Sequence, residues 1–264
     1  MEYVEIAGTR IGFEQRGRGT PLVLLHGIPA DGRVWRRQLD ALSDEYQVFA
    51  WDAPGCGRSS DPAGPLGLTE VAGHLASFIG ALELDHPHVL GLSWGGGLAL
   101  ELYRIAPTLP RSLVLASAYA GWAGSLPPDA VARRLDAYLT AARTPSREAL
   151  RGWGPGMFSE SASEDLIAEL IEISSNYHPG ALADLARSFA TTDLRTTLPT
   201  ITVPTLVLHG DSDVRSPLTV GEALHDALPG STLVVLEGVG HVSNIEAPDR
   251  FNTEVRRFLR SALR

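Results

Sequence analysis

One pentapeptide places a serine between two glycines, in a pattern that suits nucleophilic chemistry: Gly91-Leu92-Ser93-Trp94-Gly95. An apolar stretch, 89–92, precedes Ser93 and a helix-like stretch follows it, so the serine would occupy a tight turn between a strand and a helix. Such a turn is strained, and glycine neighbours let the backbone pass closely enough to expose the hydroxyl. The pattern predicts Ser93 as a nucleophile; the alternative is a glycine-rich turn with a passive serine.

A serine hydroxyl needs a general base, and the base needs an acid that orients it. His241 and Asp213 each follow an apolar, strand-like stretch. Both would therefore lie in loops at the same edge of a parallel sheet as Ser93. Asp211 is the competing acid in the same loop as Asp213. Among the histidines we predict His241 as the base, and His209 as a turn residue.

The negative charge that develops on a carbonyl oxygen needs two backbone N–H donors. Trp94 would supply one at the start of the helix after Ser93, where N–H groups are free. The loop after the apolar stretch 22–25 would supply the other. In that loop Pro29 has no N–H, so Ile28 is the candidate, and His26 is expected to make structural hydrogen bonds.

Apolar runs alternate with helical stretches along most of the chain, after an N-terminal hairpin. Such alternation predicts an α/β fold, with a mostly parallel central sheet and helices on both faces. One helix is expected to start at Thr69, and Thr69 is predicted to be its N-cap. Residues 119–199 break the alternation, because they contain no convincing strand. We expect a core of residues 1–118 and 200–264, with a helical cap (lid) inserted at 119–199. Its helix-like stretches are 129–142, 164–174 and 179–191.

The expected cap contains large apolar side chains that could cover a substrate pocket. The candidate substrate-binding residues are Trp122, Trp153, Met157, Phe158 and Tyr177. Packing inside the cap is the alternative for each of them.

Composition excludes several classes of function. The chain of 264 residues contains no lysine, which removes phosphate-binding P-loops, Schiff-base aldolases and pyridoxal-phosphate enzymes. The single cysteine, Cys56, removes disulfide frameworks and cysteine-rich metal sites. The net charge of −9 argues against nucleic acid or an anionic membrane as a partner. No signal-peptide pattern or run of ~20 apolar residues is visible, so a cytoplasmic location is expected, without metal or cofactor.

The motifs together resemble those of the α/β-hydrolase superfamily. They are His26-Gly27-Ile28-Pro29, Asp52-Ala53-Pro54-Gly55-Cys56-Gly57-Arg58-Ser59, the Ser93 pentapeptide, Gly210-x-x-Asp213 and Gly240-His241. The chain is most similar to the branch that contains enol-lactonases, esterases and cofactor-free haloperoxidases. A serine at the nucleophile position speaks against the epoxide-hydrolase and haloalkane-dehalogenase branches. The resemblance implies Asp213 as the acid of a Ser-Asp-His triad.

These observations predict a serine hydrolase that cleaves a small carboxylic ester or lactone through an acyl-enzyme. The motifs leave two other reactions open, hydrolysis of a carbon–carbon bond in a diketone-like substrate and acyl transfer. A ligand-binding protein with this fold is a third hypothesis, although no triad residue is missing. A dinucleotide-binding oxidoreductase is weaker still, because Gly55-Cys56-Gly57 lacks the third glycine of that motif.

Overall fold

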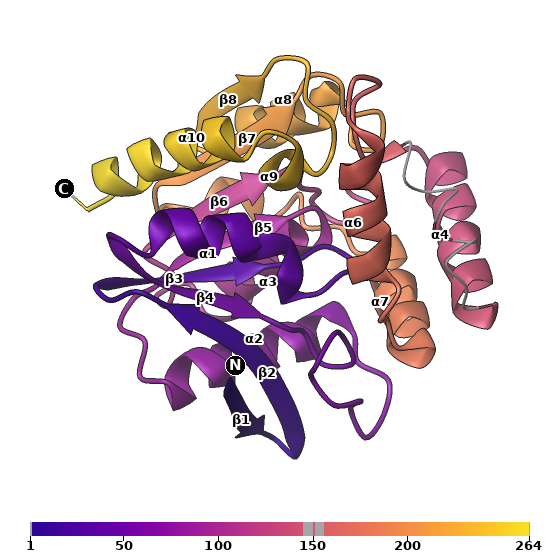
Figure 1. Ribbon diagram of the computed structural model, residues 1–264, viewed down its shortest axis with the longest axis horizontal. Helices are drawn as coiled ribbons and strands as arrows, with labels where there is room; N and C mark the ends of the chain where they lie inside the picture. Colours follow the sequence, from indigo (N-terminus) through magenta and orange to yellow (C-terminus); the bar gives the residue numbers. More distant parts are fainter. Residues whose placement is uncertain (1, 145–149, 151–155, 264) are drawn as a thin grey trace.

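The computed structural model describes residues 2–144, 150 and 156–263, and an eight-stranded sheet forms its centre (Figure 1). The strands are β1 (Glu2–Ile6), β2 (Thr9–Arg16), β3 (Thr20–Leu25), β4 (Tyr46–Trp51), β5 (His88–Leu92), β6 (Ser112–Ala116), β7 (Thr205–Gly210) and β8 (Thr232–Leu236). They are ordered β1-β2-β4-β3-β5-β6-β7-β8. The β1–β2 and β2–β4 pairs are antiparallel, and the other neighbouring pairs are parallel. The predicted mostly parallel sheet is confirmed.

The central strands are apolar on both faces, because both faces are covered. In β3, Leu22 and Leu24 belong to one apolar cluster, whereas Val23 and Leu25 belong to the other. All four side chains are 0% exposed. A strand buried on both faces has no polar side, so its sequence is a continuous apolar run. This burial fixes the carboxyl ends of the strands, from which the site loops start.

Helices cover both faces of the sheet, as predicted (Figure 1). One apolar cluster receives side chains of α1 (Arg36–Leu42) and α10 (Pro248–Ser261). The other receives side chains of α2 (Leu68–Ala81), α3 (Trp94–Ile105) and α8 (Leu218–Ala227). Two short elements lie in the loops, the 3-10 helix η1 (Gly32–Trp35) and α9 (Ser243–Glu246).

Residues 119–199, here called the insertion, connect β6 to β7. They contain α4 (Pro128–Arg143), α6 (Glu164–Ser174) and α7 (Pro179–Thr191), and the short η3 (Leu198–Thr200) crosses their C-terminal boundary. Their helices lie together at one end of the molecule (Figure 1). In its described residues the insertion has no strand. The helices occupy the stretches that the sequence predicts, within one residue at each end of α4.

The predicted N-cap of α2 is wrong. The helix begins at Leu68 with Gly67 as its N-cap, so Thr69 lies inside the first turn. The Thr69 hydroxyl donates instead to Glu101 of α3. A partner more than thirty positions away competes with the local capping bond, and sequence spacing does not reveal it.

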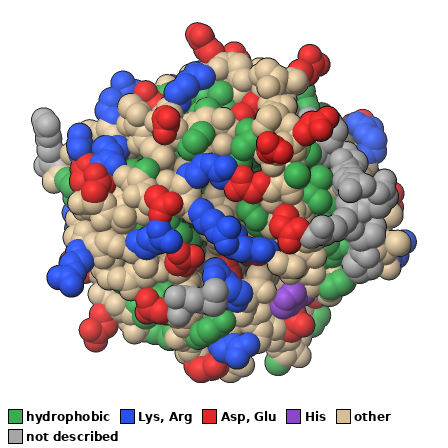
Figure 2. Space-filling view, viewed as in Figure 1, with side chains coloured by type: hydrophobic (Ala, Val, Ile, Leu, Met, Phe, Trp, Pro, Cys, Tyr) green, Lys and Arg blue, Asp and Glu red, His purple; other side chains and the backbone are tan. Residues whose placement is uncertain are grey.

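Arginine and acidic side chains are interspersed over the face drawn in Figure 2. Of the helices in the described part of the chain, none combines the length and the apolar character that crossing a bilayer requires.

Candidate active site

Ser93 lies at the bend where β5 ends and α3 begins. Its backbone has φ 57° and ψ −114°, a conformation that residues other than glycine rarely adopt. A Cβ at Gly91 would collide with the backbone of Gly95, and a Cβ at Gly95 would collide with the Leu25 carbonyl. The two glycines therefore let α3 start directly against the sheet. This close approach keeps Ser93 in the strained turn that the pentapeptide predicts.

Asp213 and His241 meet from the loops that follow β7 and β8. His241 Nδ1 lies 2.8 Å from Asp213 Oδ2, and both side chains are buried. An ionised carboxylate can only accept a hydrogen bond, so Nδ1 carries the hydrogen. The lone pair of His241 is then on Nε2, which is the ring atom that can take a proton.

Electrostatics favour the charge states that a general base requires. Burial raises the pKa of Asp213, but the attraction of His241 and the amide donors outweighs it, so the pKa lies below its ordinary value of 3.8. The donors are the backbone N–H groups of Arg215 and Ser216, 2.9 and 2.7 Å from Asp213 Oδ1. Burial is the largest influence on His241 and lowers its pKa below the ordinary 6.5, against the attraction of Asp213. Near neutral pH, Asp213 is ionised and His241 is neutral.

Ser93 and His241 line the same cavity, whose volume is about 30 Å³. Over the described ranges no hydrogen bond joins the Ser93 hydroxyl to His241. Catalytic hydrogen bonds often align only when a substrate is bound, so this geometry is compatible with proton transfer between them.

Of the two predicted oxyanion donors, Trp94 directly follows Ser93 and Ile28 lines the same cavity as Ser93. Trp94 is the first residue of α3, where the helix leaves its N–H groups unpaired. Within residues 2–144, 150 and 156–263, neither the Trp94 amide nor the Ile28 amide donates to a protein acceptor. In the same loop as Ile28, His26 Nε2 accepts from the Ala53 amide at 3.0 Å, and Nδ1 then donates to the Gly27 carbonyl at 2.9 Å. His26 therefore has the structural hydrogen bonds that the sequence predicts.

The prediction that His209 is a turn residue is wrong, because His209 lies within β7. The strand continues past its predicted end, since Gly210 pairs with Leu236 of β8. His209 is buried, and its Nε2 lies 2.6 Å from the Ser216 carbonyl and 3.7 Å from Asp213 Oδ2. It fixes the end of the loop that carries Asp213.

A polar bridge connects the insertion to two loops of the site. The Tyr138 hydroxyl, on α4, donates to the Ile28 carbonyl at 2.9 Å and accepts from the Arg215 guanidinium at 2.9 Å. The Arg215 carbonyl in turn accepts from Tyr119 at 2.8 Å and from Arg134 of α4 at 2.6 Å. The loop of Ile28 and the loop of Asp213 are therefore tied to the same helix.

The predicted substrate-binding residues have different positions. Met157 lines the Ser93 cavity. Trp122 packs against Tyr138 and Phe189, with ring centroids 5.2 and 5.5 Å away, and Tyr177 donates to the Ala141 carbonyl at 2.7 Å. Phe158 is buried, and its backbone would collide with a Cβ at Gly240. Trp153 lies outside the described residues.

Sequence reasoning missed several residues that line this cavity. They are Ala30, Val34, Leu170, Ser174 and Val242. Leu170 and Ser174 are four positions apart on α6, which places them on one face of the helix. That spacing was the one signal in the sequence, although it does not reveal what the face contacts.

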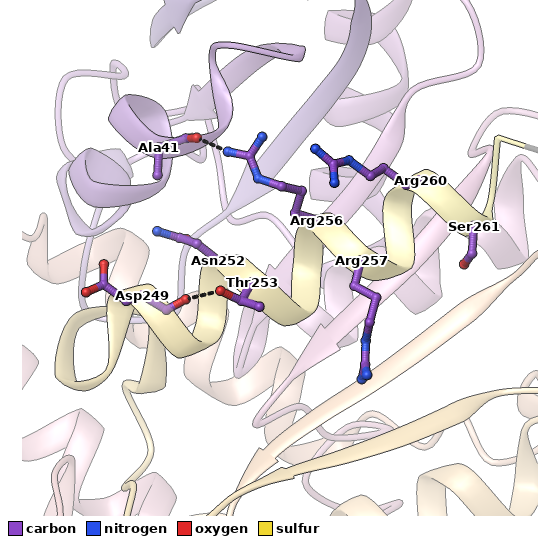
Figure 3. A pocket seen from close by; sticks show the side chains of 8 residues that line it. All are labelled: Ala41, Asp249, Asn252, Thr253, Arg256, Arg257, Arg260 and Ser261. Atoms are coloured by element: carbon purple, nitrogen blue, oxygen red, sulfur yellow. Dashed lines mark hydrogen bonds between the residues drawn. The ribbon is translucent and has the colours of Figure 1, made fainter.

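A larger cavity, of about 710 Å³, lies away from these residues, along α10. Figure 3 shows Arg256 directed toward Ala41 and Arg257 directed away from it. Carboxylates already pair with its guanidinium groups: Arg256 and Arg260 bind Glu45, and Arg257 binds Glu254. This groove contains none of the predicted catalytic residues.

The chain is similar to known proteins in both sequence and fold. Residues 22–254 match the model of the Alpha/beta hydrolase family. The chain is 29% identical to a pimeloyl-(acyl-carrier protein) methyl ester esterase of Aliivibrio salmonicida, over 95% of this chain and 96% of that protein. A thermophilic esterase from Thermogutta terrifontis has a similar structure, with TM-score 0.91, 28% identity and 99% of each chain covered. The enol-lactonase of Burkholderia xenovorans gives TM-score 0.88 at 26% identity, over 98% of this chain and 99% of that one. The chain belongs to the alpha/beta hydrolase family.

Proposed function

We propose that this hydrolase cleaves carboxylic esters or lactones with Ser93 as nucleophile, His241 as general base and Asp213 as the orienting acid. As the Ser93 oxygen bonds to the substrate carbonyl carbon, His241 Nε2 takes its proton. The C–O bond to the alcohol then breaks, and His241 returns the proton to the departing oxygen. Water, deprotonated by His241, attacks the acyl-enzyme, releases the acid and restores the Ser93 hydroxyl.

In this proposal the Ile28 and Trp94 amides bind the oxygen of the tetrahedral intermediate. Both amides lack a protein acceptor in the described part of the chain, so they can donate as the charge develops. Desolvation strengthens these interactions in a small cavity.

One observation carries the proposal: the buried His241–Asp213 pair shares a cavity with a serine in a strained strand–helix turn. The names of the similar proteins agree with cleavage of an ester or a lactone.

We also propose that the insertion, residues 119–199, acts as a cap over a core of residues 1–118 and 200–264. Support comes from Met157, Leu170 and Ser174, which belong to the insertion and line the cavity of Ser93. A cytoplasmic location remains a prediction from the sequence.

A fluorophosphonate probe and a substrate panel test the proposed function together. We expect the probe to label Ser93, identified by mass spectrometry of the digested protein, and to leave Ser93→Ala unlabelled. The panel compares esters, lactones and β-diketones, in water labelled with heavy oxygen, which enters the acid on ester hydrolysis. If only the diketones are cleaved, the reaction is hydrolysis of a carbon–carbon bond instead of an ester. If the acyl group is transferred to added alcohols and no labelled acid forms, the reaction is acyl transfer. If the probe labels another residue of the folded protein instead, Ser93 is not the nucleophile.

The pH profile of kcat/KM should report the lowered pKa of His241. Activity is expected to rise with pH as His241 loses its proton, with the acidic midpoint below the ordinary histidine value of 6.5. The sign follows because burial favours the neutral imidazole, which is the active form. Initial rates over about pH 4 to 8, at constant ionic strength, give the midpoint. A midpoint above 6.5 would contradict the assignment of a buried, neutral base.

A further inference from the structure

The cavity of Ser93 contains a hydroxyl for which the proposed mechanism has no role. Among the described residues that line it, Ser174 has the one polar side chain besides Ser93 and His241. Ser174 is 6% exposed, and its Oγ makes no hydrogen bond within the described part of the chain. A helical serine commonly bonds back to a carbonyl of the preceding turn, which satisfies its hydroxyl. The Ser174 hydroxyl is therefore available to a partner that enters the cavity.

The helix that carries Ser174 is held to the core at two positions, each next to a residue that lines the cavity. The Arg33 guanidinium donates to the carbonyl of Ile173 at 2.8 Å. One turn earlier, Arg37 makes two hydrogen bonds of 2.7 Å to Glu169. These contacts fix α6, so the Ser174 hydroxyl occupies a defined place in the cavity wall.

The rest of the cavity is small and apolar. Its volume of about 30 Å³ compares with roughly 300–1,000 Å³ for pockets that hold drug-sized ligands. Aliphatic and thioether side chains form much of the wall: Ala30, Val34, Met157, Leu170 and Val242. A cavity of this size favours short acyl groups over long ones, and a polar atom on such a group would find the Ser174 hydroxyl in the wall.

We propose that Ser174 is a specificity-determining residue, which selects esters or lactones of short acids that carry a hydroxyl group near the carbonyl. The inference rests on the proposed function and deepens it. A substrate hydroxyl would exchange a hydrogen bond with Ser174 Oγ. An analogue with a methyl group in its place would leave Ser174 buried and unpaired, and a site that hydrogen-bonds a substrate hydroxyl discriminates strongly against such analogues.

The test compares isosteric ethyl esters by acid release. One pair is 3-hydroxybutanoate and 3-methylbutanoate, and the other is 2-hydroxypropanoate and 2-methylpropanoate. For at least one pair, wild-type kcat/KM should favour the hydroxy ester by roughly 10-fold or more. In Ser174→Ala the ratio should fall to near one. The matched control is Ser175→Ala, which removes an exposed hydroxyl that donates to the Glu172 carbonyl at 2.8 Å, and which should keep the wild-type ratio.

The length of the acyl chain provides a second test of the inference. Wild-type kcat/KM should fall by about 10-fold or more from ethyl butanoate to ethyl octanoate, because a small cavity favours the shorter chain. The rate of fluorophosphonate labelling shows that each variant keeps a working Ser93.

The outcomes separate the inference from the proposed function. If Ser93 is labelled and esters are cleaved, but the hydroxy-to-methyl ratio is the same in wild type and Ser174→Ala, the inference is overturned and the proposed function stands. Equal rates with octanoate and butanoate also overturn it. If no ester or lactone is cleaved and Ser93 is not labelled, the proposed function fails and the inference fails with it.

Discussion

The Ser93→Ala variant is expected to lose roughly 10⁴–10⁶-fold in kcat while it keeps its fold. Alanine has no group that can form the acyl-enzyme, so the variant retains only the catalysis that binding and the oxyanion donors supply. Single-turnover and steady-state rates with the best ester of the panel measure the loss.

The fold should be unaffected because alanine keeps the Cβ atom. The backbone strain at φ 57° is then the same in both proteins, and the close packing of Gly91 and Gly95 is untouched. Thermal unfolding followed by circular dichroism should give a Tm within about 3 °C of wild type. Near-normal turnover by a folded Ser93→Ala protein would exclude the proposed mechanism.

The Asp213→Asn variant is expected to lose roughly 10³–10⁴-fold in kcat/KM. An amide in place of the carboxylate removes the charge that stabilises the imidazolium and can impose the wrong tautomer on His241. The amide oxygen can still accept from the Arg215 and Ser216 N–H groups, so the loop should keep its shape.

Asp211→Asn is the matched control, and it decides between the two acids that the sequence leaves open. Asp211 is exposed, and its Oδ1 accepts from the Gly238 amide at 2.7 Å and from Ser212 Oγ at 3.0 Å. We expect Asp211→Asn to retain activity within a few-fold of wild type. The opposite result, a large loss in Asp211→Asn and a small one in Asp213→Asn, would move the role of the acid to Asp211.

The fold was largely predictable because local patterns determine its elements. Continuous apolar runs such as 22–25 identify buried parallel strands, which β3 confirms. In α6, Leu166, Leu170 and Ile173 recur at helical spacing, and the helix has the predicted bounds. Glycines around Ser93 identify the strand–helix turn. Each of these signals lies within about a dozen residues of sequence.

Contacts between distant segments were not predictable in the same way. Helical periodicity identifies the buried face of α6 but not that Ser174 meets the cavity of Ser93. Trp122 is apolar whether it faces a substrate or packs against Tyr138, and the structure has it packed. The Tyr138–Ile28 bond joins residues 110 positions apart, for which a single sequence contains no signal.

That bond has a consequence for protein engineering. Tyr138 belongs to the insertion, yet its hydroxyl is shared by the Ile28 loop and by Arg215 of the Asp213 loop. A chimera that exchanges residues 119–199 for the corresponding segment of another hydrolase would therefore alter two loops that it leaves unchanged in sequence. Such a transplant needs a phenol at the equivalent position of the donor, so the junction between the parts is defined by side-chain hydrogen bonds as well as by the points where the chain is cut.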